Sequence, residues 1–220
     1  MPSDNEIDRR DRAVMALLLM TGMRDRALVG LKIRDINLDR KYLFQDPRHI
    51  GTKFRKQIDT FFLPVGEEML AIFREWWTFL VTEKGFGPED PVFPKTVTVS
   101  GGDFAVQELG RHHWASAGPV RKCFRDAFAR IGIAVTRPHS VRDTLTQFAY
   151  SRRFSPEQMK AFSQNLGHDS VATTYPNYGQ LSRERQGEII LALDQASGEG
   201  PVNEISTPDL ANILAKRLSA

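Results

Sequence analysis

The sequence contains a single cysteine, Cys123, among its 220 residues. One thiol cannot form an internal disulfide, and it leaves too few thiols for a cysteine-rich zinc site. No uncharged apolar run approaches the roughly 20 residues that a membrane-spanning helix needs. The polar N-terminus also lacks the apolar core of a signal peptide. These absences favour a protein of the reducing cytoplasm that has no membrane partner.

Several common catalytic motifs are missing too. The sequence has no glycine-rich phosphate loop ending in Gly-Lys-Ser/Thr and no His-Glu-x-x-His zinc motif. The acidic pairs at 67–68 and 89–90 are not spaced as a two-metal site requires, and His112 and His113 lack acidic or thiol partners nearby. We therefore expect no metal and no cofactor, so that any phosphoryl chemistry would proceed without a metal ion.

Positive charge is concentrated in one part of the chain. The net charge is only +3, but residues 111–153 carry nine Lys or Arg against two Asp, a local excess of seven positive charges. Such an excess is typical of a surface that binds a phosphate-rich partner. A solvated basic helix face would carry the same charges, so the excess alone does not identify a nucleic acid as the partner.

Periodic apolar positions and capping residues predict a mainly α fold. Helices are predicted over residues 6–20, 24–32, 66–85, 117–132, 139–150, 155–167 and 183–196. Short β-branched and aromatic runs at 41–45, 49–54 and 58–65 predict a small three-stranded antiparallel β-sheet, and the glycines and prolines of 85–104 predict a loop. We expect one domain over 1–196, followed over 197–220 by a linker and an amphipathic helix.

Metal-free attack on a phosphodiester needs three kinds of side chain. Arginines neutralise the non-bridging oxygens, a hydroxyl forms a covalent intermediate, and a lysine or histidine protonates the leaving oxygen. The sequence offers candidates for each in the order Arg24 ("TGMR"), Lys53 ("GTKFRK"), His139 and Arg142 ("RPHSVRDTL"), His168 ("LGH") and Tyr178 ("YPNYG").

These motifs, taken together and in this order, resemble the catalytic domain of the tyrosine recombinases, the phage integrase family. The matching stretches, "TGMR…LKIRDINLD", "TKFRK", "PHSVRDTL" and "LGHDSVATTYPNYG", span most of residues 7–195. The resemblance implies that a tyrosine cleaves DNA, forms a 3′-phosphotyrosyl link and rejoins the strand to another, without metal or nucleotide.

The resemblance also assigns a role to each catalytic candidate. Arg24 and Arg142 match the two arginines that clamp the phosphate, and Lys53 matches the general acid for the leaving 5′ oxygen. His139 matches the histidine that assists proton transfer. His168 matches the histidine that binds the scissile phosphate. Tyr178 matches the nucleophile, whereas Tyr175 is interpreted as a packing residue.

Three positions depart from the family pattern. Ala27 stands where a glutamate is usual, so Arg24 must be oriented by another group. Asp143 replaces a common histidine, and the nucleophile's usual position, nine residues after His168, is Asn177. Pro176 breaks the helix there, so a one-residue insertion before Tyr178 is tolerable.

The resemblance implies a site-specific recombinase or integrase that binds double-stranded DNA as a homo-oligomer, with the C-terminal helix docking on a neighbouring copy. Members of the family normally carry a DNA-clamping domain before the catalytic one, and the chain begins almost at the catalytic domain, so that clamp is expected to be absent. Two alternatives remain open: a non-catalytic DNA-binding regulator of integrase sites, and an enzyme that resembles type IB topoisomerases.

Overall fold

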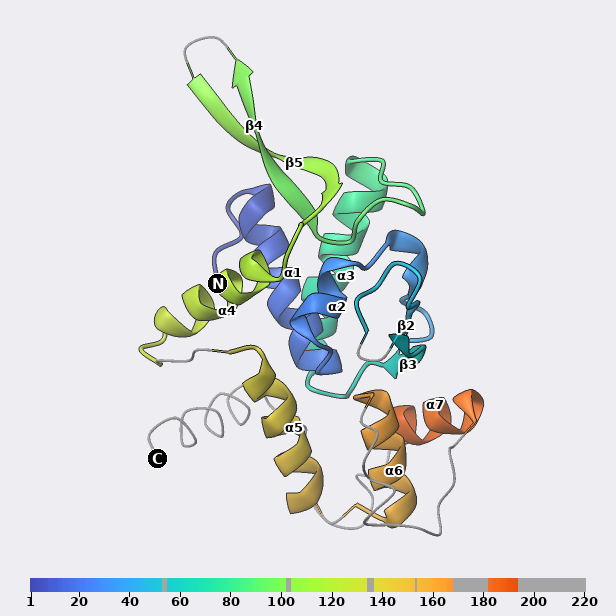
Figure 1. Cartoon of the computed structure of the whole chain (residues 1–220). Helices are drawn as coiled ribbons and strands as arrows, with labels where there is room; N and C mark the ends of the chain where they lie inside the picture. The colour runs from blue at the N-terminus through green and yellow to red at the C-terminus, as the bar shows by residue number, and fades with distance from the viewer. Residues whose placement is uncertain (53–54, 102–103, 134–136, 153, 168–181, 194–220) are drawn as a thin grey trace.

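The structure, a computed structural model, describes residues 1–52, 55–101, 104–133, 137–152, 154–167 and 182–193 (Figure 1). Its α-helices are α1 (Glu6–Thr21), α2 (Asp25–Val29), α3 (Glu67–Thr78), α4 (Gly118–Ala129), α5 (His139–Ser151), α6 (Pro156–Asn165) and α7 (Arg183–Ala192). A 3₁₀ turn, η1 (Ile33–Asp35), follows α2, and a π-helical turn, η3 (Phe79–Glu83), extends α3. The strands are β1 (Ile36–Asn37), β2 (Tyr42–Gln45), β3 (Ile58–Phe61), β4 (Pro94–Gly101) and β5 (Phe104–His113).

Helix α1 forms the centre of the core. The Asn5 side chain caps its start by accepting from the backbone N–H groups of Ile7 and Asp8. Gly22 ends it in the left-handed conformation at φ 57°, which residues with a Cβ adopt only at a cost. Between these caps the stretch 13–21 is buried without interruption, and α1 packs along α3. A helix buried all round serves as a fixed support for the turn that follows it.

The three-stranded antiparallel sheet has the order β1-β2-β3 and confirms the predicted fold class. One predicted strand is wrong: the described residues of 49–54 form a turn and loop, and Ile36–Asn37 supplies the third strand instead. The reason is local, since the Asp46 carbonyl accepts from the N–H groups of both His49 and Ile50 and so bends the chain. The β2–β3 connection is therefore a long loop.

The predicted loop over 85–104 is also wrong in its second half. Residues 94–101 and 104–113 form the two antiparallel strands β4 and β5, which project from the body (Figure 1). The base of this pair is fixed to α1, because Arg10 Nη1 donates to the Pro94 carbonyl at 2.9 Å and Glu6 Oε1 accepts from Leu109 N at 2.7 Å. The alternating Thr and Val residues of β4 outweigh the glycines around them.

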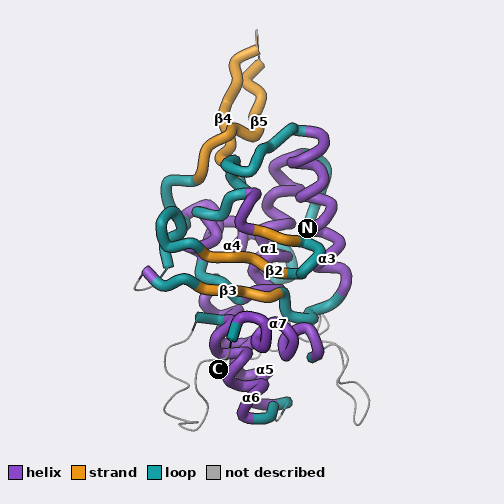
Figure 2. The backbone as a smooth tube through the Cα atoms, turned by 90° about the vertical axis from the view of Figure 1, so that its right-hand side faces the viewer, coloured by secondary structure: helices purple, strands orange, loops and turns teal. Residues whose placement is uncertain are grey.

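The lower part of the molecule contains α5, α6 and α7, with α6 and α7 against β3 (Figure 2). Ser155 and Gln158 form a reciprocal capping box at the start of α6. No helix among the described residues has the length and apolarity that crossing a membrane requires.

Candidate active site

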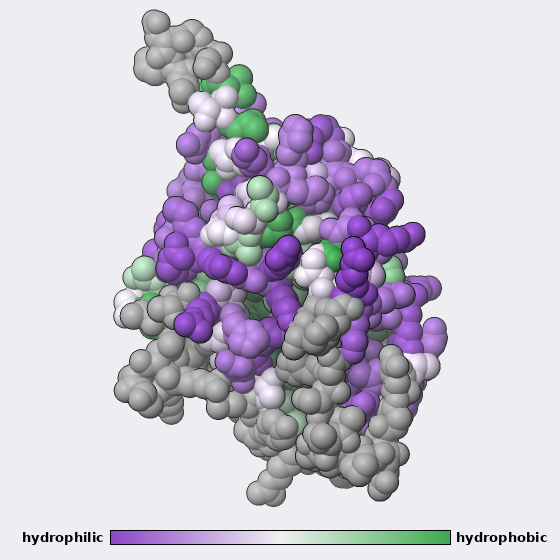
Figure 3. All heavy atoms as spheres, in the orientation of Figure 1, coloured by the Kyte–Doolittle hydropathy of each residue, from purple (hydrophilic) through white to green (hydrophobic). Residues whose placement is uncertain are grey.

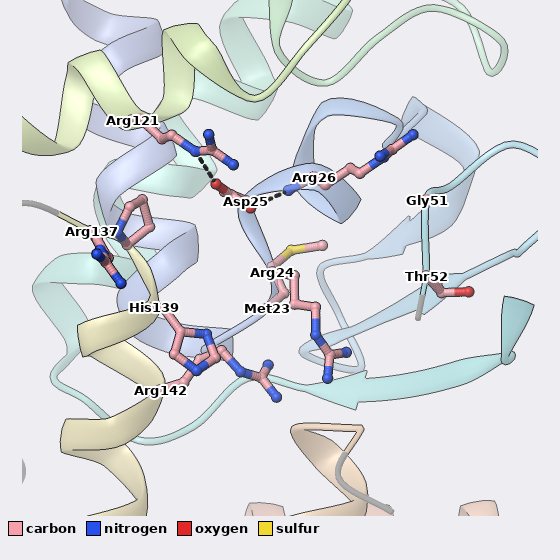
Figure 4. A pocket seen from close by; sticks show the side chains of 11 residues that line it. Met23, Arg24, Asp25, Arg26, Gly51, Thr52, Arg121, Arg137, His139 and Arg142 are labelled. Carbon is pink, nitrogen blue, oxygen red and sulfur yellow. Dashed lines mark hydrogen bonds and ion pairs between the residues drawn. The ribbon is translucent and has the colours of Figure 1, made fainter. Parts of the chain in front are cut away.

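Of the six predicted catalytic residues, the structure describes Arg24, His139 and Arg142, and it brings all three to one cleft. Lys53, His168 and Tyr178 lie outside the described residues, as does Tyr175. The cleft has a volume of about 810 Å³ and opens between the start of α2, the start of α5 and the β2–β3 loop (Figure 4). The described side chains that line it include six cationic or imidazole groups, Arg24, Arg26, Arg121, Arg137, His139 and Arg142, and one carboxylate, Asp25.

Arg24 reaches the cleft from the turn between α1 and α2. It is the N-cap residue of α2 with extended backbone, φ −71° and ψ 141°. Its carbonyl accepts from the backbone N–H groups of Ala27 and Leu28, which fixes its backbone to the first turn of the helix. The left-handed Gly22 two residues earlier turns the chain so that the half-buried Arg24 side chain points into the cleft, towards Arg142 (Figure 4).

Arg142 is held more tightly, because its side chain is buried in α5 with 2% exposure. Its Nη1 donates to the Gly22 carbonyl and its Nη2 to the Leu166 carbonyl, both at 2.6 Å. A guanidinium has five N–H donors, so these two bonds leave three. One of the three is Nε–H, which is buried and has no partner among the described residues. Arg142 is thus oriented by two carbonyls and keeps donors for a ligand.

The electrostatics of this pair favour an anion. Burial, and after it the nearby positive charge of Arg24, together lower the pKa of Arg142 to about 10, while Asp143 acts in the opposite direction. The side chain remains a cation at neutral pH, at an energetic cost. Two guanidinium groups that face one cleft without an intervening carboxylate repel each other, and a bound phosphate oxyanion relieves both that repulsion and the desolvation of Arg142.

His139 lies one helical turn before Arg142 on α5 and lines the same cleft. Its side chain is 62% exposed, and its Nε2 lies 3.8 Å from an Asp143 carboxylate oxygen. Asp143, which departs from the family pattern, therefore lies next to the His139 imidazole on the same face of α5. The imidazole is accessible from the cleft and can exchange a proton with a bound ligand.

The residues that precede two of the candidates outside the described part either line the cleft or contact its Arg142. Gly51 and Thr52, which directly precede Lys53, line it. Leu166, whose carbonyl binds Arg142, is followed by Gly167 and then by His168. Gly167 has φ 66°, and a Cβ on it would lie 2.7 Å from Ile58 Cδ1, so any residue other than glycine would be strained there. Three motif regions thus line one cleft, and the fourth contacts it through the bond from Arg142 to the Leu166 carbonyl, although the four are widely separated in the sequence.

Sequence reasoning missed Arg26, Arg121 and Arg137 as cleft residues. The basic segment over 111–153 contains two of them, but it gave no indication which of its arginines would face the site. The Arg121 Nε donates to Asp25 Oδ2 at 2.6 Å, and Asp25 Oδ1 accepts from the Arg26 backbone N–H. This carboxylate braces the start of α2, close to the position where the usual glutamate is replaced by the buried Ala27.

We expect Gly22→Ala to destabilise the protein by about 3 kcal/mol, with the left-handed backbone and the overpacking as the two causes. The new Cβ would lie 2.6 Å from Leu166 Cδ2 and 2.8 Å from Leu145 Cδ1. Gly132→Ala is the matched control, since Gly132 has φ 75° but nothing within 4 Å of the added Cβ. Urea unfolding measures both, and equal losses for the two variants would show that packing around Gly22 is loose.

Among the described residues, no group of three or more His, Cys, Asp or Glu side chains could hold a metal ion. The described groups that line the cleft are suited to an anionic ligand, through arginine donors and one exposed imidazole.

Comparisons with known proteins agree with this geometry. Residues 1–185 match the sequence model of the Phage integrase family. The chain is 27% identical over 176 residues to Tyrosine recombinase XerC of Xylella fastidiosa, an alignment covering 79% of this chain and 50% of that protein. It is 26% identical over 174 residues to Tyrosine recombinase XerS of Streptococcus gordonii, covering 79% of this chain and 43% of the relative.

A solved structure shares the fold. The crystal structure of XerA recombinase superimposes with a TM-score of 0.52 at 22% sequence identity, covering 89% of this chain and 64% of that one. The chain spans about half the length of the curated relatives that it matches.

Proposed function

The chain belongs to the phage integrase family, and from this premise we propose that it is a site-specific DNA recombinase that cleaves and rejoins strands through a 3′-phosphotyrosyl intermediate. The observation that carries the proposal is the convergence of Arg24 and the buried Arg142 in one cleft with His139. Acting on DNA implies a cytoplasmic, nucleoid-associated protein.

In the proposed reaction, a scissile phosphate binds between the two guanidinium groups. The Tyr178 hydroxyl oxygen attacks phosphorus, the P–O5′ bond breaks, and the 5′ oxygen leaves with a proton from Lys53. Arg24 and Arg142 hold the non-bridging oxygens on which negative charge gathers in the transition state. His139 accepts the proton that the Tyr178 hydroxyl loses on attack, and His168 donates a hydrogen bond to the phosphate. Attack by the 5′ hydroxyl of another strand on the phosphotyrosine reverses the step and rejoins the DNA.

The same proposal divides the chain into a catalytic unit and a C-terminal segment. Residues 1–196 would form the catalytic unit, and residues 197–220 a linker and a helix that docks on a neighbouring copy. Apolar residues of "TPDLANILAKRL" recur at helical spacing, so one face of that helix needs an apolar partner. The helix itself lies outside the described residues.

Deleting residues 203–220 should then lower assembly on DNA without lowering the affinity of the first copy. The comparison is with a variant in which the same residues are shuffled, so that length and composition stay constant. Mobility-shift assays of single and multiple occupancy measure both effects, and unchanged multiple occupancy after the deletion would rule out docking by this helix.

A second basic cleft lies beside the first and could bind the DNA backbone beyond the scissile phosphate. It has a volume of about 860 Å³ and adjoins the first, with which it shares Arg26, Gly51, Thr52 and Arg121. Its described lining includes the further basic or imidazole residues Lys32, Arg48, His49, Arg55 and His113 and no carboxylate. Hydrophilic residues dominate this face of the molecule (Figure 3). Such a surface fits the phosphate backbone of DNA.

DNA binding should therefore fall steeply with salt, by several orders of magnitude between about 50 and 200 mM if six or more phosphates are contacted. Arg26→Ala and Arg55→Ala should each reduce the slope of log affinity against log salt by about 1. The control is Arg74→Ala, because Arg74 is exposed on α3 and lines neither cleft. Fluorescence anisotropy with a labelled duplex of random sequence measures the slopes, and an affinity independent of salt would contradict the proposed surface.

A further inference from the structure

The outer edge of strand β3 is paired by side chains instead of by another strand. Because β3 is the last strand of the order β1-β2-β3, its outward N–H and C=O groups need other partners. The outward backbone groups of residues 59 and 61 point to the side of β3 where α6 and α7 pack (Figure 2). The residues that satisfy them come from the two helices that border the segment with His168 and Tyr178.

Asn165, the last residue of α6, makes the bonds that a neighbouring strand would make. Its Oδ1 accepts from Phe61 N at 2.6 Å, and its Nδ2 donates to the Phe61 carbonyl at 2.9 Å. Its own carbonyl accepts from Thr60 Oγ1 at 3.3 Å. The residue is 1% exposed. These bonds fix the end of α6 to the sheet in two directions, which apolar packing alone would not do.

Gln186 of α7 completes the arrangement. Its Nε2 donates to the Asp59 carbonyl at 2.9 Å and to Asn165 Oδ1 at 3.3 Å. Gln186 is 5% exposed, so neither bond competes strongly with water. One amide from each helix is thus held to the same strand, and each supports the other.

The residue after Asn165 connects this network to the cleft. The Leu166 carbonyl is one of the two that orient the Arg142 guanidinium, at 2.6 Å from Nη2. A shift of the α6 end away from β3 moves this carbonyl and rotates the guanidinium, because the Gly22 carbonyl on the other side would remain in place. The free donors of Arg142, Nε–H among them, would then turn away from the position of the phosphate.

We propose that Asn165 is a positioning residue for the phosphate-binding Arg142, acting through the Leu166 carbonyl, with Gln186 as its support. This inference rests on the proposed function of the cleft as a phosphate site. It assigns a role to a residue that contacts neither the phosphate nor a reacting atom.

The test uses inorganic sulfate as the probe of the anion site, so that it needs no DNA cleavage. The Arg142 Nε–H signal in a ¹H–¹⁵N spectrum, identified by its loss in Arg142→Lys, should shift on addition of sulfate to the wild-type protein. Asn165→Leu keeps the branching at Cγ but removes all three hydrogen bonds of the amide, two with Phe61 and one with Gln186. It should move this signal in the free protein and weaken sulfate binding about tenfold, the cost of one misaligned charge-assisted hydrogen bond.

A matched control separates positioning from a general loss of stability. Gln45→Met removes a buried amide bond to Thr60 Oγ1, the hydroxyl that also donates to the Asn165 carbonyl. It touches neither the two bonds between the Asn165 amide and Phe61 nor the bond between Leu166 and Arg142. If Gln45→Met lowers the melting temperature as much as Asn165→Leu does, it should still leave the Arg142 signal and the sulfate affinity at their wild-type values. If Asn165→Leu does not fold, Gln186→Met is the milder second variant. It should shift the Arg142 Nε–H signal in the same direction as Asn165→Leu, by a smaller amount.

Wild-type sulfate affinity and an unmoved Arg142 signal in Asn165→Leu, or in Gln186→Met, would overturn the inference. So would an equal effect of Gln45→Met, which would mean that any weakening of the sheet reaches Arg142. Failure of the protein to cleave DNA would overturn the proposed function instead, and leaves the sulfate result as it stands.

Discussion

Replacing Arg142 with lysine is expected to slow formation of the covalent DNA link by about 10²–10³-fold, the usual cost of removing one donor that stabilises a transition-state oxyanion. Arg142 has to satisfy the Gly22 and Leu166 carbonyls and the phosphate at once, with donors that diverge from one planar group. Lysine has a single ammonium and cannot reach all three. The rate should be measured in single turnover on a nicked duplex at saturating protein.

The control for this prediction is Arg125→Lys. Arg125 is exposed on α4 and belongs to the same basic segment, but it does not line the cleft. Its rate should stay within about threefold of wild type, the spread typical of surface substitutions within ±0.5 kcal/mol. If Arg142→Lys also cleaved at the wild-type rate, Arg142 would be a structural residue only, and the phosphate would have to bind elsewhere.

Helices were predictable from the sequence where one face is strongly apolar or a cap is marked. The stripe containing Leu70 and Phe73 predicted α3, and Ser155 with Pro156 predicted the start of α6. The β4–β5 hairpin was missed because glycine and proline density outweighed the Thr-Val alternation at 96–99. The loop at 49–52 was taken for a strand because its bend depends on the Asp46 carbonyl, whose hydrogen bonds leave no signal in residue type.

Only those residues of the site that belong to a recognisable motif could be predicted from the sequence. Arg24, His139 and Arg142 came from the family resemblance, and the structure brings them together. Asn165 carries no motif, since its role depends on Phe61, which lies far away in the sequence. Arg121 likewise matters because α4 packs close to Asp25. Such roles arise from tertiary contacts that local composition does not encode.

Replacing Tyr178 with phenylalanine is expected to abolish the covalent link, to below about 10⁻³ of the wild-type rate, because phenylalanine keeps the ring but has no hydroxyl to attack phosphorus. Tyr175→Phe should retain the link, since we assign Tyr175 to packing, which the ring alone satisfies. The prediction decides which of two tyrosines, one on each side of Pro176 and Asn177, is the nucleophile. Tyr178 lies one residue beyond the family's usual spacing from His168.

The measurement that tests the central claim is the trapping of this link. A pool of duplexes with randomised sequence and a nick just beyond the candidate scissile phosphate lets the released 5′-hydroxyl strand diffuse away, so that protein joined to DNA accumulates and identifies its own target. On the recovered duplex, without added metal, the wild type and Tyr175→Phe should give a DNA-linked protein band that Tyr178→Phe lacks. A band that persists in Tyr178→Phe and disappears in Tyr175→Phe would move the nucleophile, and no band from the wild type on any duplex would contradict the recombinase assignment and favour a DNA-binding regulator.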